Sequence, residues 1–520
     1  MRIITADDAA ALIKNRDTVI VGGSAGMGAA ESVLAAIERA FRANGKPRDL
    51  GIIHATGVGA VTEKGLNHLA HRGLVKRVIG GNYGLQLPFM RELIVSNAIE
   101  AYNLPQGVIC QLYRAMAAKH PGVVSHVGLH TYMDPRQEGG KMNTATTEDI
   151  IEVVALAGRE WLFYHAPVAQ VALIRGTTAD EDGNVSLEHE ATTLEGISIA
   201  QAVHNAGGTV ICQVERLAQR GSLHPQMVRI PGFLIDRFVV VSDQWQNFAV
   251  RFDASLCGET RRPIATIAPG PLNERRVISR RSAFELTPGA VINLGVGVSA
   301  GIPNVLNEER LNDLAVLTVE SGVIGGVPGE GLYFGSAYNP SAIIDQGYQF
   351  DFYDGGGLDI AFVSFAEVDA EGNVNVTRFG NRNDGSGGFI DITQTAKRIV
   401  FGGTLVGGAK VAIAGEKLAI RAEGMVHKFV PRVGQISYNG QLGRERGQDV
   451  TFVSERAVLR MTRDGLTLTE IAPGVRVKED VLAHIGFEVK VATELKTMDA
   501  RIFREGPMGL REDIMARRTA

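Results

Sequence analysis

The sequence predicts an α/β protein of two related, open α/β domains with mostly parallel sheets, and three observations support this fold class. Short β-rich runs alternate with amphipathic segments along the chain. Glycine supplies 62 of the 520 residues, in small clusters beside the apolar runs, where turns bring the backbone close to its neighbours. An internal similarity relates the start of the chain to a later part. The order strand, glycine turn, helix, strand is typical of parallel sheets covered by helices.

The first unit of this pattern opens the chain. The run TVIVGG at 18–23 predicts a strand, and the amphipathic segment at 29–45 predicts a helix that ends at a glycine. Further apolar runs predict strands in both parts of the chain. They are LGIIHATG, KRVIGG, GTVICQV and DRFVVVS in the first part, and INLGVG, LAVLTVESG, LDIAFVS and AKRIVFGG in the later part.

Two pairs of similar segments divide the chain into halves. DTVIVGGSAGMGAAESVL near the start is similar to GAVINLGVGVSAGIPNVL at 289–306, and ADEDGNVSLE at 179–188 is similar to VDAEGNVNVT at 368–377. The order is the same in both halves, but the spacing is much longer in the first, which predicts a long insertion there. Pro- and Arg-rich pieces interrupt the pattern between the halves.

The expected organisation therefore has three parts. We predict a first domain over 1–225, a linker region over 226–285 and a second domain over 286–520.

Composition excludes several classes of protein. Lysine and arginine total 53 and aspartate and glutamate 57, a net charge of −4, so no strong positive field favours nucleic acid or an anionic membrane. The N-terminal segment has no long apolar run, and the uncharged stretch near 300 is rich in glycine, proline and asparagine. Cys110, Cys212 and Cys257 are far apart and form no CxxC pair, which favours a reducing compartment. These features predict a soluble cytoplasmic protein.

Two further motifs could have a chemical function, but a structural role is the favoured interpretation of each. GGSAGMG at 22–28 follows a strand and opens a helix, as a phosphate-binding turn does, and it also contains GxSxG with Ser24 as the formal nucleophile. Its glycine spacing and its place after a single strand favour a plain tight turn. His120, His126 and His130 match no zinc spacing closely, so we predict no metal site.

Glu320 is the first candidate for catalysis. The β run LTV ends at this glutamate, and the small residues SGVIGG follow it. Parallel sheets place their ligands at the carboxyl ends of the strands. A carboxylate there, followed by a glycine-rich segment, is suited to a substrate that must approach the backbone closely, although many such glutamates are surface or capping residues.

Several motifs in the same order resemble those of a known family. ESGxxGG at Glu320, AYNLPQG at 101–107, DPRQEGGKMN at 134–143, the FYDGGGLDIAFVSFAEVDAEGNVNV block and GSGGFIDITQTAKRIVF resemble family I coenzyme A-transferases. The similarity is closest to the single-chain acetate/propionate (short-chain acyl) type with fused halves, and it covers nearly the whole chain. It implies the CoA-transferase fold, with the active site between the two domains, and a homo-oligomer, expected to be a tetramer.

The resemblance also implies a role for each site residue. Glu320 matches the nucleophile, which forms a covalent glutamyl–CoA thioester in a ping-pong reaction. A backbone amide of Gly387 or Gly388 would face the oxyanion, Asn293 would orient the carboxylate, and Gln106 would reach the reacting carboxyl from the first half. The chemistry needs no permanently bound cofactor and no metal, because CoA is itself the substrate.

The leading functional interpretation is an acyl-CoA:carboxylate CoA-transferase that acts on short acids such as acetate. An acyl-CoA thioester hydrolase of the same fold, or a catalytically silent acyl-CoA-binding protein, stays open as an alternative. Small acids would need bulky walls near Glu320. The aromatic segment GLYFGSAYNP at 331–340 and Tyr102 are the candidates for these walls.

Overall fold

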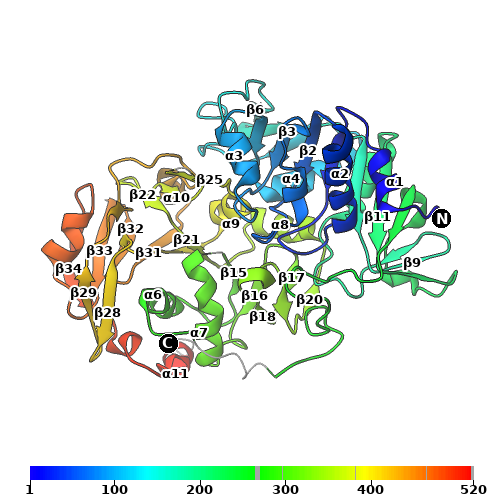
Figure 1. Ribbon diagram of the computed structural model, residues 1–520. Coiled ribbons are helices and arrows are strands. Elements are labelled where there is room, and N and C mark those ends of the chain that lie inside the picture. The colour runs from blue at the N-terminus through cyan, green and yellow to red at the C-terminus, as the bar shows by residue number, and fades with distance from the viewer. Residues whose placement is uncertain (264–269, 296, 381, 464, 517–520) are drawn as a thin grey trace.

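Each half of the chain contributes one large sheet to the computed structural model, which describes residues 1–263, 270–295, 297–380, 382–463 and 465–516 (Figure 1). The first sheet has seven strands, and every neighbouring pair is parallel. In spatial order they are β14 (Arg237–Val240), β11 (Thr209–Val214), β8 (Val171–Arg175), β1 (Thr18–Val21), β2 (Leu50–His54), β3 (Val75–Gly80) and β4 (Glu100–Asn103).

The second sheet has ten strands, and its centre repeats the parallel arrangement of the first. In order they are β20 (Ala342–Ile343), β17 (Val323–Ile324), β16 (Val316–Val319), β15 (Val291–Leu294), β21 (Ile360–Ser364), β26 (Arg398–Gly402), β31 (Asp449–Val453), β32 (Ala457–Thr462), β33 (Gly465–Ile471) and β34 (Lys490–Thr497). From β16 to β31 all neighbours are parallel, and antiparallel pairings flank this core on both sides. The predicted α/β class with mostly parallel sheets is confirmed.

The internal similarity has a structural counterpart in hydrogen bonds. Asp180 Oδ1 accepts from the N–H groups of Asp182 and Asn184, and Asn184 Oδ1 accepts from the N–H of Gly232. The second half repeats each bond, with Asp369 and Asn373 in the equivalent places and the N–H of Gly440 as the last donor. The similar DGNV and EGNV segments therefore fold into the same turn.

Helices cover both sheets. They are α1 (Ala6–Ala11), α2 (Glu31–Asn44), α3 (Phe89–Val95), α4 (Gln106–Ala117) and α5 (Gly196–Asn205) in the first half, and α6 (Glu274–Ala283), α7 (Ile302–Glu308), α8 (Gln346–Asp354), α9 (Phe389–Thr395), α10 (Gly440–Glu445) and α11 (Leu510–Ala516) after it. The helix predicted over 29–45 is α2, which ends at Gly45 with φ +70° in the left-handed region. In the described ranges no helix is both long and apolar enough to cross a bilayer.

The predicted insertion in the first half is confirmed. A separate antiparallel sheet of β5 (Gly122–Ser125), β7 (Arg159–His165) and β6 (Ile151–Leu156) lies between β4 and β8 in the chain. Smaller pieces complete the fold. They are β9 (Thr178–Asp180), β10 (Val185–Ser186), β12 (Arg216–Ala218), β13 (Val228–Ile230), β18 (Val327–Pro328), β19 (Ala337–Tyr338), β22 (Glu367–Val368), β23 (Val374–Asn375), β24 (Arg378–Phe379), β25 (Arg382–Asn383), β27 (Val406–Gly407), β28 (Lys410–Ala414), β29 (Lys417–Ala422) and β30 (Val426–His427).

The segment 226–285, predicted as a linker, is partly built into the two halves. β14 within it pairs with β11 of the first sheet, while α6 packs on the second half through ion pairs from Arg281 to Glu470. The three-part division stays a prediction, and these contacts favour a later end for the first part and an earlier start for the second.

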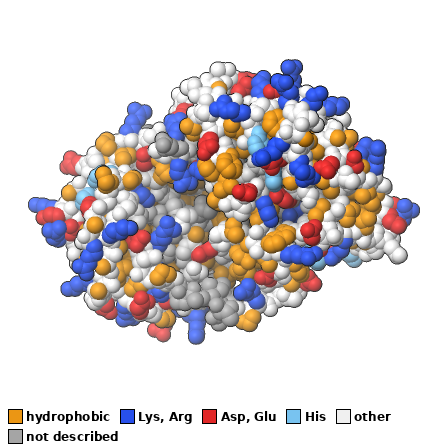
Figure 2. Space-filling model, in the orientation of Figure 1, with side chains coloured by type: hydrophobic (Ala, Val, Ile, Leu, Met, Phe, Trp, Pro, Cys, Tyr) orange, Lys and Arg blue, Asp and Glu red, His pale blue; other side chains and the backbone are white. Residues whose placement is uncertain are grey.

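The two halves share one hydrophobic core. The main cluster of buried apolar side chains includes Ile109 of α4 and Phe350 of α8, which come from different halves, and α4 packs against both α8 and α9. Figure 2 shows positive and negative side chains interspersed over the visible face, as the small net charge leads us to expect.

Candidate active site

Glu320 lies directly after β16, at the carboxyl end of this central strand. The chain turns sharply there, because the N–H of Gly322 donates to Val319 O at 3.0 Å and Gly322 has φ +96°. A Cβ atom on Gly322 would lie 2.1 Å from Ile344 O. Only glycine fits this turn, so the glycine after the predicted strand holds Glu320 at the edge where parallel sheets bind their ligands.

The Glu320 side chain faces a cavity of about 390 Å³ that both halves line. Ligand sites of enzymes fall in this range of volume. The cavity brings together four of the five predicted site residues, which are Glu320, Gln106, Gly387 and Gly388. Its other walls include Asn82, Phe334, Phe365, Arg382, Asp384 and Ser386.

Gly388 lies directly against the Glu320 carboxyl group. A Cβ atom at this position would lie 2.6 Å from Glu320 Oε2 and 2.9 Å from the ring of Phe350. The carboxyl group therefore occupies the space that any side chain at 388 would need. This contact explains why the glycine segment beside α9 contains a glycine at this point.

The backbone amides of the two candidate glycines differ in their hydrogen bonding. The N–H of Gly387 donates to Gly81 O at 2.6 Å, so it is already occupied. The N–H of Gly388 has no acceptor among the residues that the structure describes. Gly388 is thus the glycine with an amide available to a substrate oxygen.

Gln106 enters the cavity from the first half. It is the first residue of α4, and its N–H donates to Gly387 O at 3.0 Å. Its side chain is buried, yet neither Nε2 nor Oε1 has a hydrogen-bond partner in the described part of the chain. Buried amides are nearly always paired, so this unpaired amide at a cavity wall points to a ligand.

Asn293 lies outside the lining of the cavity. It is buried on β15, where Nδ2 donates to Tyr353 Oη at 3.1 Å and to Thr318 O at 3.4 Å. Thr318 is two residues before Glu320 on the neighbouring strand. Its direct orientation of the carboxylate stays a prediction, while its hydrogen bonds fix the strand that ends at Glu320.

Burial governs the charge of Glu320. It has no hydrogen-bond or ion-pair partner among the described residues, and burial raises the pKa of its carboxyl group to about 7. A buried carboxylate without a cation is a strong nucleophile because nothing in its surroundings stabilises the negative charge. At neutral pH the group is divided between the ionised and the protonated form.

The prediction that Tyr102 forms a wall of the pocket is wrong, because Tyr102 does not line the cavity. Tyr102 is fully buried on β4, its hydroxyl donates to Glu148 O at 2.9 Å, and the Arg77 guanidinium lies 5.7 Å from its ring centre. The alternation of the strand turns this ring into the core instead of the cavity. Of the aromatic segment 331–340, Phe334 lines the cavity.

Asn103 supports the glycine segment of the candidate site, and the sequence interpretation missed it. Its Nδ2 donates to Gly80 O at 2.7 Å and Gly81 O at 2.6 Å, and its Oδ1 accepts the N–H of Ser386 at 2.9 Å. It thereby joins the glycine segment of the second half to the first half. Its place in the same AYNLPQG motif as Gln106 is the sequence feature that could have identified it. Its partner Ser386 is 283 residues away in the chain, so the sequence did not reveal the contact.

The two weaker motifs take structural roles. Ser24 is buried in a tight turn between β1 and α2, where its N–H donates to Met27 O at 2.9 Å, which confirms the favoured interpretation. The ring of His126 packs edge-on against Trp161. Within the described residues no three His, Cys, Asp or Glu side chains form a group that could hold a metal ion.

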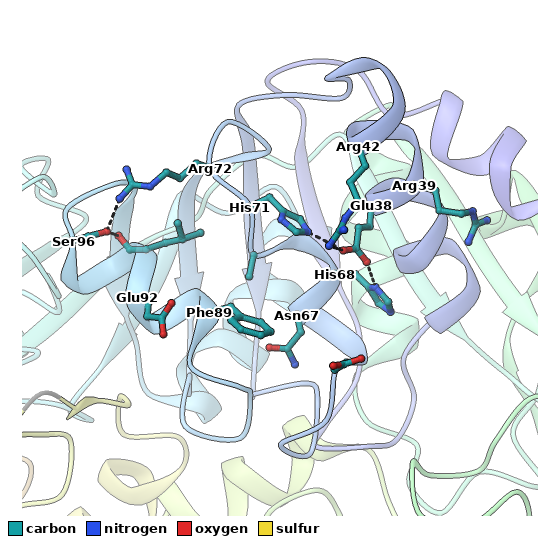
Figure 3. A pocket seen from close by; sticks show the side chains of 13 residues that line it. Glu38, Arg39, Arg42, Asn67, His68, His71, Arg72, Phe89, Glu92 and Ser96 are labelled. Carbon is teal, nitrogen blue, oxygen red and sulfur yellow. Dashed lines mark hydrogen bonds and ion pairs between the residues drawn. The ribbon is translucent and has the colours of Figure 1, made fainter.

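A larger cavity of about 890 Å³ lies beside α2, α3 and the short helix Gly65–Leu69 (Figure 3). Both of its histidines are paired with Glu38. His68 Nδ1 lies 2.5 Å from Glu38 Oε2, and His71 Nε2 lies 2.9 Å from Glu38 Oε1. Its histidines are therefore not free to act on a substrate, and we place the candidate chemistry at the cavity of Glu320.

Comparisons with known proteins identify the family of the chain. A family model described as coenzyme A transferase matches residues 3–241. The chain is 43% identical over 510 residues to the acetate CoA-transferase YdiF of Escherichia coli K12, covering 98% of this chain and 96% of that one. It is 40% identical over 517 residues to the caffeate CoA-transferase of Acetobacterium woodii, covering 98% of each.

Two crystal structures of YdiF from Escherichia coli O157:H7 have the same fold. The apoenzyme matches with a TM-score of 0.93 and the thioester complex with CoA with 0.92. Each is 42% identical and covers 98% of this chain and 97% of that one. This similarity extends over both halves and confirms the family that the sequence motifs suggest. The chain belongs to the family I coenzyme A-transferases.

Proposed function

We propose that this protein transfers CoA from a short-chain acyl-CoA to a free carboxylic acid, with acetate as one acceptor, through a covalent thioester between CoA and Glu320. One observation carries the proposal. The Glu320 carboxyl group lies unpaired at a cavity between the halves, directly against Gly388.

The proposed reaction starts with attack of the Glu320 carboxylate on the thioester carbonyl. The carbon–sulfur bond breaks, leaving a mixed anhydride on Glu320 and a CoA thiolate. The thiolate then attacks the glutamyl carbonyl and expels the first carboxylic acid as its carboxylate, which leaves Glu320 bound to CoA. The incoming acid reverses these steps and departs as the new acyl-CoA.

Each addition step forms an oxyanion that fixed donors must face. The N–H of Gly388 is the proposed backbone donor, because the N–H of Gly387 is bonded to Gly81. The Nε2 group of Gln106 is the proposed second donor, since its side chain lines the cavity without a partner.

The wider setting of the enzyme is also proposed. Its sparse, separate cysteines favour a cytoplasmic enzyme. We propose that it works as a homo-oligomer, with a tetramer as the expected form, and that CoA enters as substrate while no cofactor is permanently bound.

The decisive test is Glu320→Gln. This variant keeps the size of the side chain but cannot form an anhydride, so we expect transferase activity to vanish. With acyl-CoA and no acceptor, the wild type should accumulate a CoA adduct that mass spectrometry locates on the peptide containing Glu320. An adduct on another peptide, or full turnover by Glu320→Gln, would remove Glu320 from the mechanism.

Glu195→Gln is the matched control. Glu195 is another buried carboxyl group without a partner, and burial raises its pKa to about 8, but it does not line the cavity. We expect this variant to keep its activity. Free CoA released at the transferase rate without any carboxylic acid acceptor would instead identify the protein as a thioester hydrolase.

A further inference from the structure

A second cavity of about 500 Å³ adjoins the one that contains Glu320. The two share three lining residues, which are Leu85, Gly297 and Phe334, so they form one continuous hollow. The far side of the second cavity is lined by the first turn of α6, including Arg275 and Arg276. A long substrate whose reacting end lies at Glu320 can therefore extend toward α6.

The charged groups of this second cavity are paired, with one exception. Arg276 bonds to Glu308 Oε1 at 2.7 Å, and Glu330 Oε1 accepts from Asn304 Nδ2 at 2.9 Å. Arg275 is exposed and has no hydrogen-bond or ion-pair partner among the residues that the structure describes. It is thus a free cation at the cavity wall.

Lys428 supplies a second free cation nearby. Its Nζ lies 5.5 Å from the ring centre of Phe365, which lines the cavity of Glu320. Across the described chain it has no ion pair with a carboxylate. Burial lowers the pKa of the Lys428 ammonium group. The negative charge of Glu455 raises this pKa, and the positive charge of Arg275 lowers it. Two cations from α6 and from the segment after β30 therefore repel each other beside the joined cavities.

We propose that Arg275 and Lys428 bind the phosphate groups of the CoA moiety, with the second cavity holding the end of the substrate that lies away from Glu320. CoA is suited to this arrangement because its thiol and its phosphates are at opposite ends of a long flexible arm. Phosphate oxygens accept charge-assisted hydrogen bonds from both side chains and remove their mutual repulsion. This inference rests on the proposed function, since it assumes that the thioester lies at Glu320.

The experiment compares two donors with the same thioester. Acetyl-CoA carries the nucleotide phosphates, and acetyl-pantetheine has none of them. For Arg275→Gln and for Lys428→Met, we expect the ratio of kcat/KM for acetyl-CoA to that for acetyl-pantetheine to fall about tenfold, as for one lost charge-assisted bond. The loss should be in KM for acetyl-CoA. Lys428→Arg keeps the charge and should restore the ratio.

Matched controls separate this effect from the loss of any positive charge on the protein surface. Lys76→Met and Arg421→Gln remove exposed cations that line neither cavity, and they should leave the ratio at the wild-type value. Thermal denaturation should show that each variant folds. Acetyl-dephospho-CoA lacks only the 3′-phosphate of acetyl-CoA. If one variant uses these two donors equally well while the wild type prefers acetyl-CoA, the residue changed in that variant binds the 3′-phosphate.

Two results would overturn the inference. An unchanged ratio in both variants would show that these cations do not bind the phosphates, and an equal loss with both donors would show a purely structural role. Failure of the proposed function is a separate result, because wild-type protein would then show no Glu320-dependent transfer of CoA from acetyl-CoA to a different acid such as propionate.

Discussion

The raised pKa of Glu320 leads to a prediction about the pH dependence of the proposed reaction. Attack on the thioester needs ionised Glu320, and burial raises the pKa of this group to about 7. We therefore expect kcat/KM for the acyl-CoA to rise with pH up to about 7 and then level off, because kcat/KM reports on the free enzyme. A profile measured from pH 5.5 to 8.5 checks this. A flat profile over that range would contradict the prediction, because Glu320 would then be ionised throughout it.

The same burial predicts a cost in stability. The folded protein holds the Glu320 proton more tightly than the unfolded chain, so wild-type stability falls as pH rises from the unfolded pKa of 4.5 through about 7. Glu320→Gln carries no charge at any pH. It should therefore be more stable than the wild type at pH 8, by up to about 3 kcal/mol, with a smaller gain at pH 5. Urea denaturation at both pH values measures the difference, and an equal gain at both would contradict the assignment.

At the scale of residues, sequence motifs identified the side chains that face the cavity better than those that support them. Glu320, Gly388 and Gln106 belong to motifs whose chemistry can be stated in advance, and all three line the cavity. Asn103 was missed because its role depends on a partner segment far along the chain. Tyr102 was placed wrongly because a ring in a strand motif does not reveal which face of the sheet it occupies.

Among the elements, the glycine segment that precedes α9 limits the space around the carboxyl group of Glu320, the proposed nucleophile. A methyl group on Gly388 would overlap Glu320 Oε2, so Gly388→Ala must displace the carboxyl group. A shift of about 1 Å in a reacting group costs on the order of 10²-fold in rate. We expect kcat to fall by about that factor, and the thermal midpoint to fall as well, because the same Cβ atom would lie 2.9 Å from the buried ring of Phe350.

Gly347→Ala is the control for this prediction. Gly347 is within α8, and a Cβ atom there would make only ordinary contacts, the nearest at 3.5 Å. This variant should keep its activity, because alanine also favours the helix. If Gly388→Ala retained full activity, the close contact with Glu320 would have no catalytic role.

For the whole molecule, the sequence predicted the two halves but not their limits. The repeated strand, turn and helix pattern is a local property, and it identified β1 and β15 as equivalent strands at the centre of each sheet. Membership of a sheet depends instead on contacts between distant segments. The run DRFVVVS was expected to form a strand, yet nothing in its own pattern shows that β14 pairs with β11 of the first sheet.

The joint between the halves leads to a last prediction, in which the chain is cut after Gly258. This glycine is exposed, and a Cβ atom there would meet no atom within 4 Å, so new termini disturb no packing. Contacts between the halves are noncovalent and extensive. They include two hydrogen bonds from Arg378 to Glu138 and a bond from Arg91 to Asp384.

We therefore expect the fragments 1–258 and 259–520, expressed together, to copurify and to retain Glu320-dependent transferase activity. A matched control cuts the chain after Ile292, inside the central strand β15, where the break removes a paired strand of the sheet. That pair of fragments should not assemble. Fragments 1–258 and 259–520 that stayed apart, or assembled without activity, would show that the covalent joint itself holds Gln106 and Glu320 at one cavity. Activity of the assembled pair would show instead that the shared core and the polar contacts between the halves are sufficient to build the site.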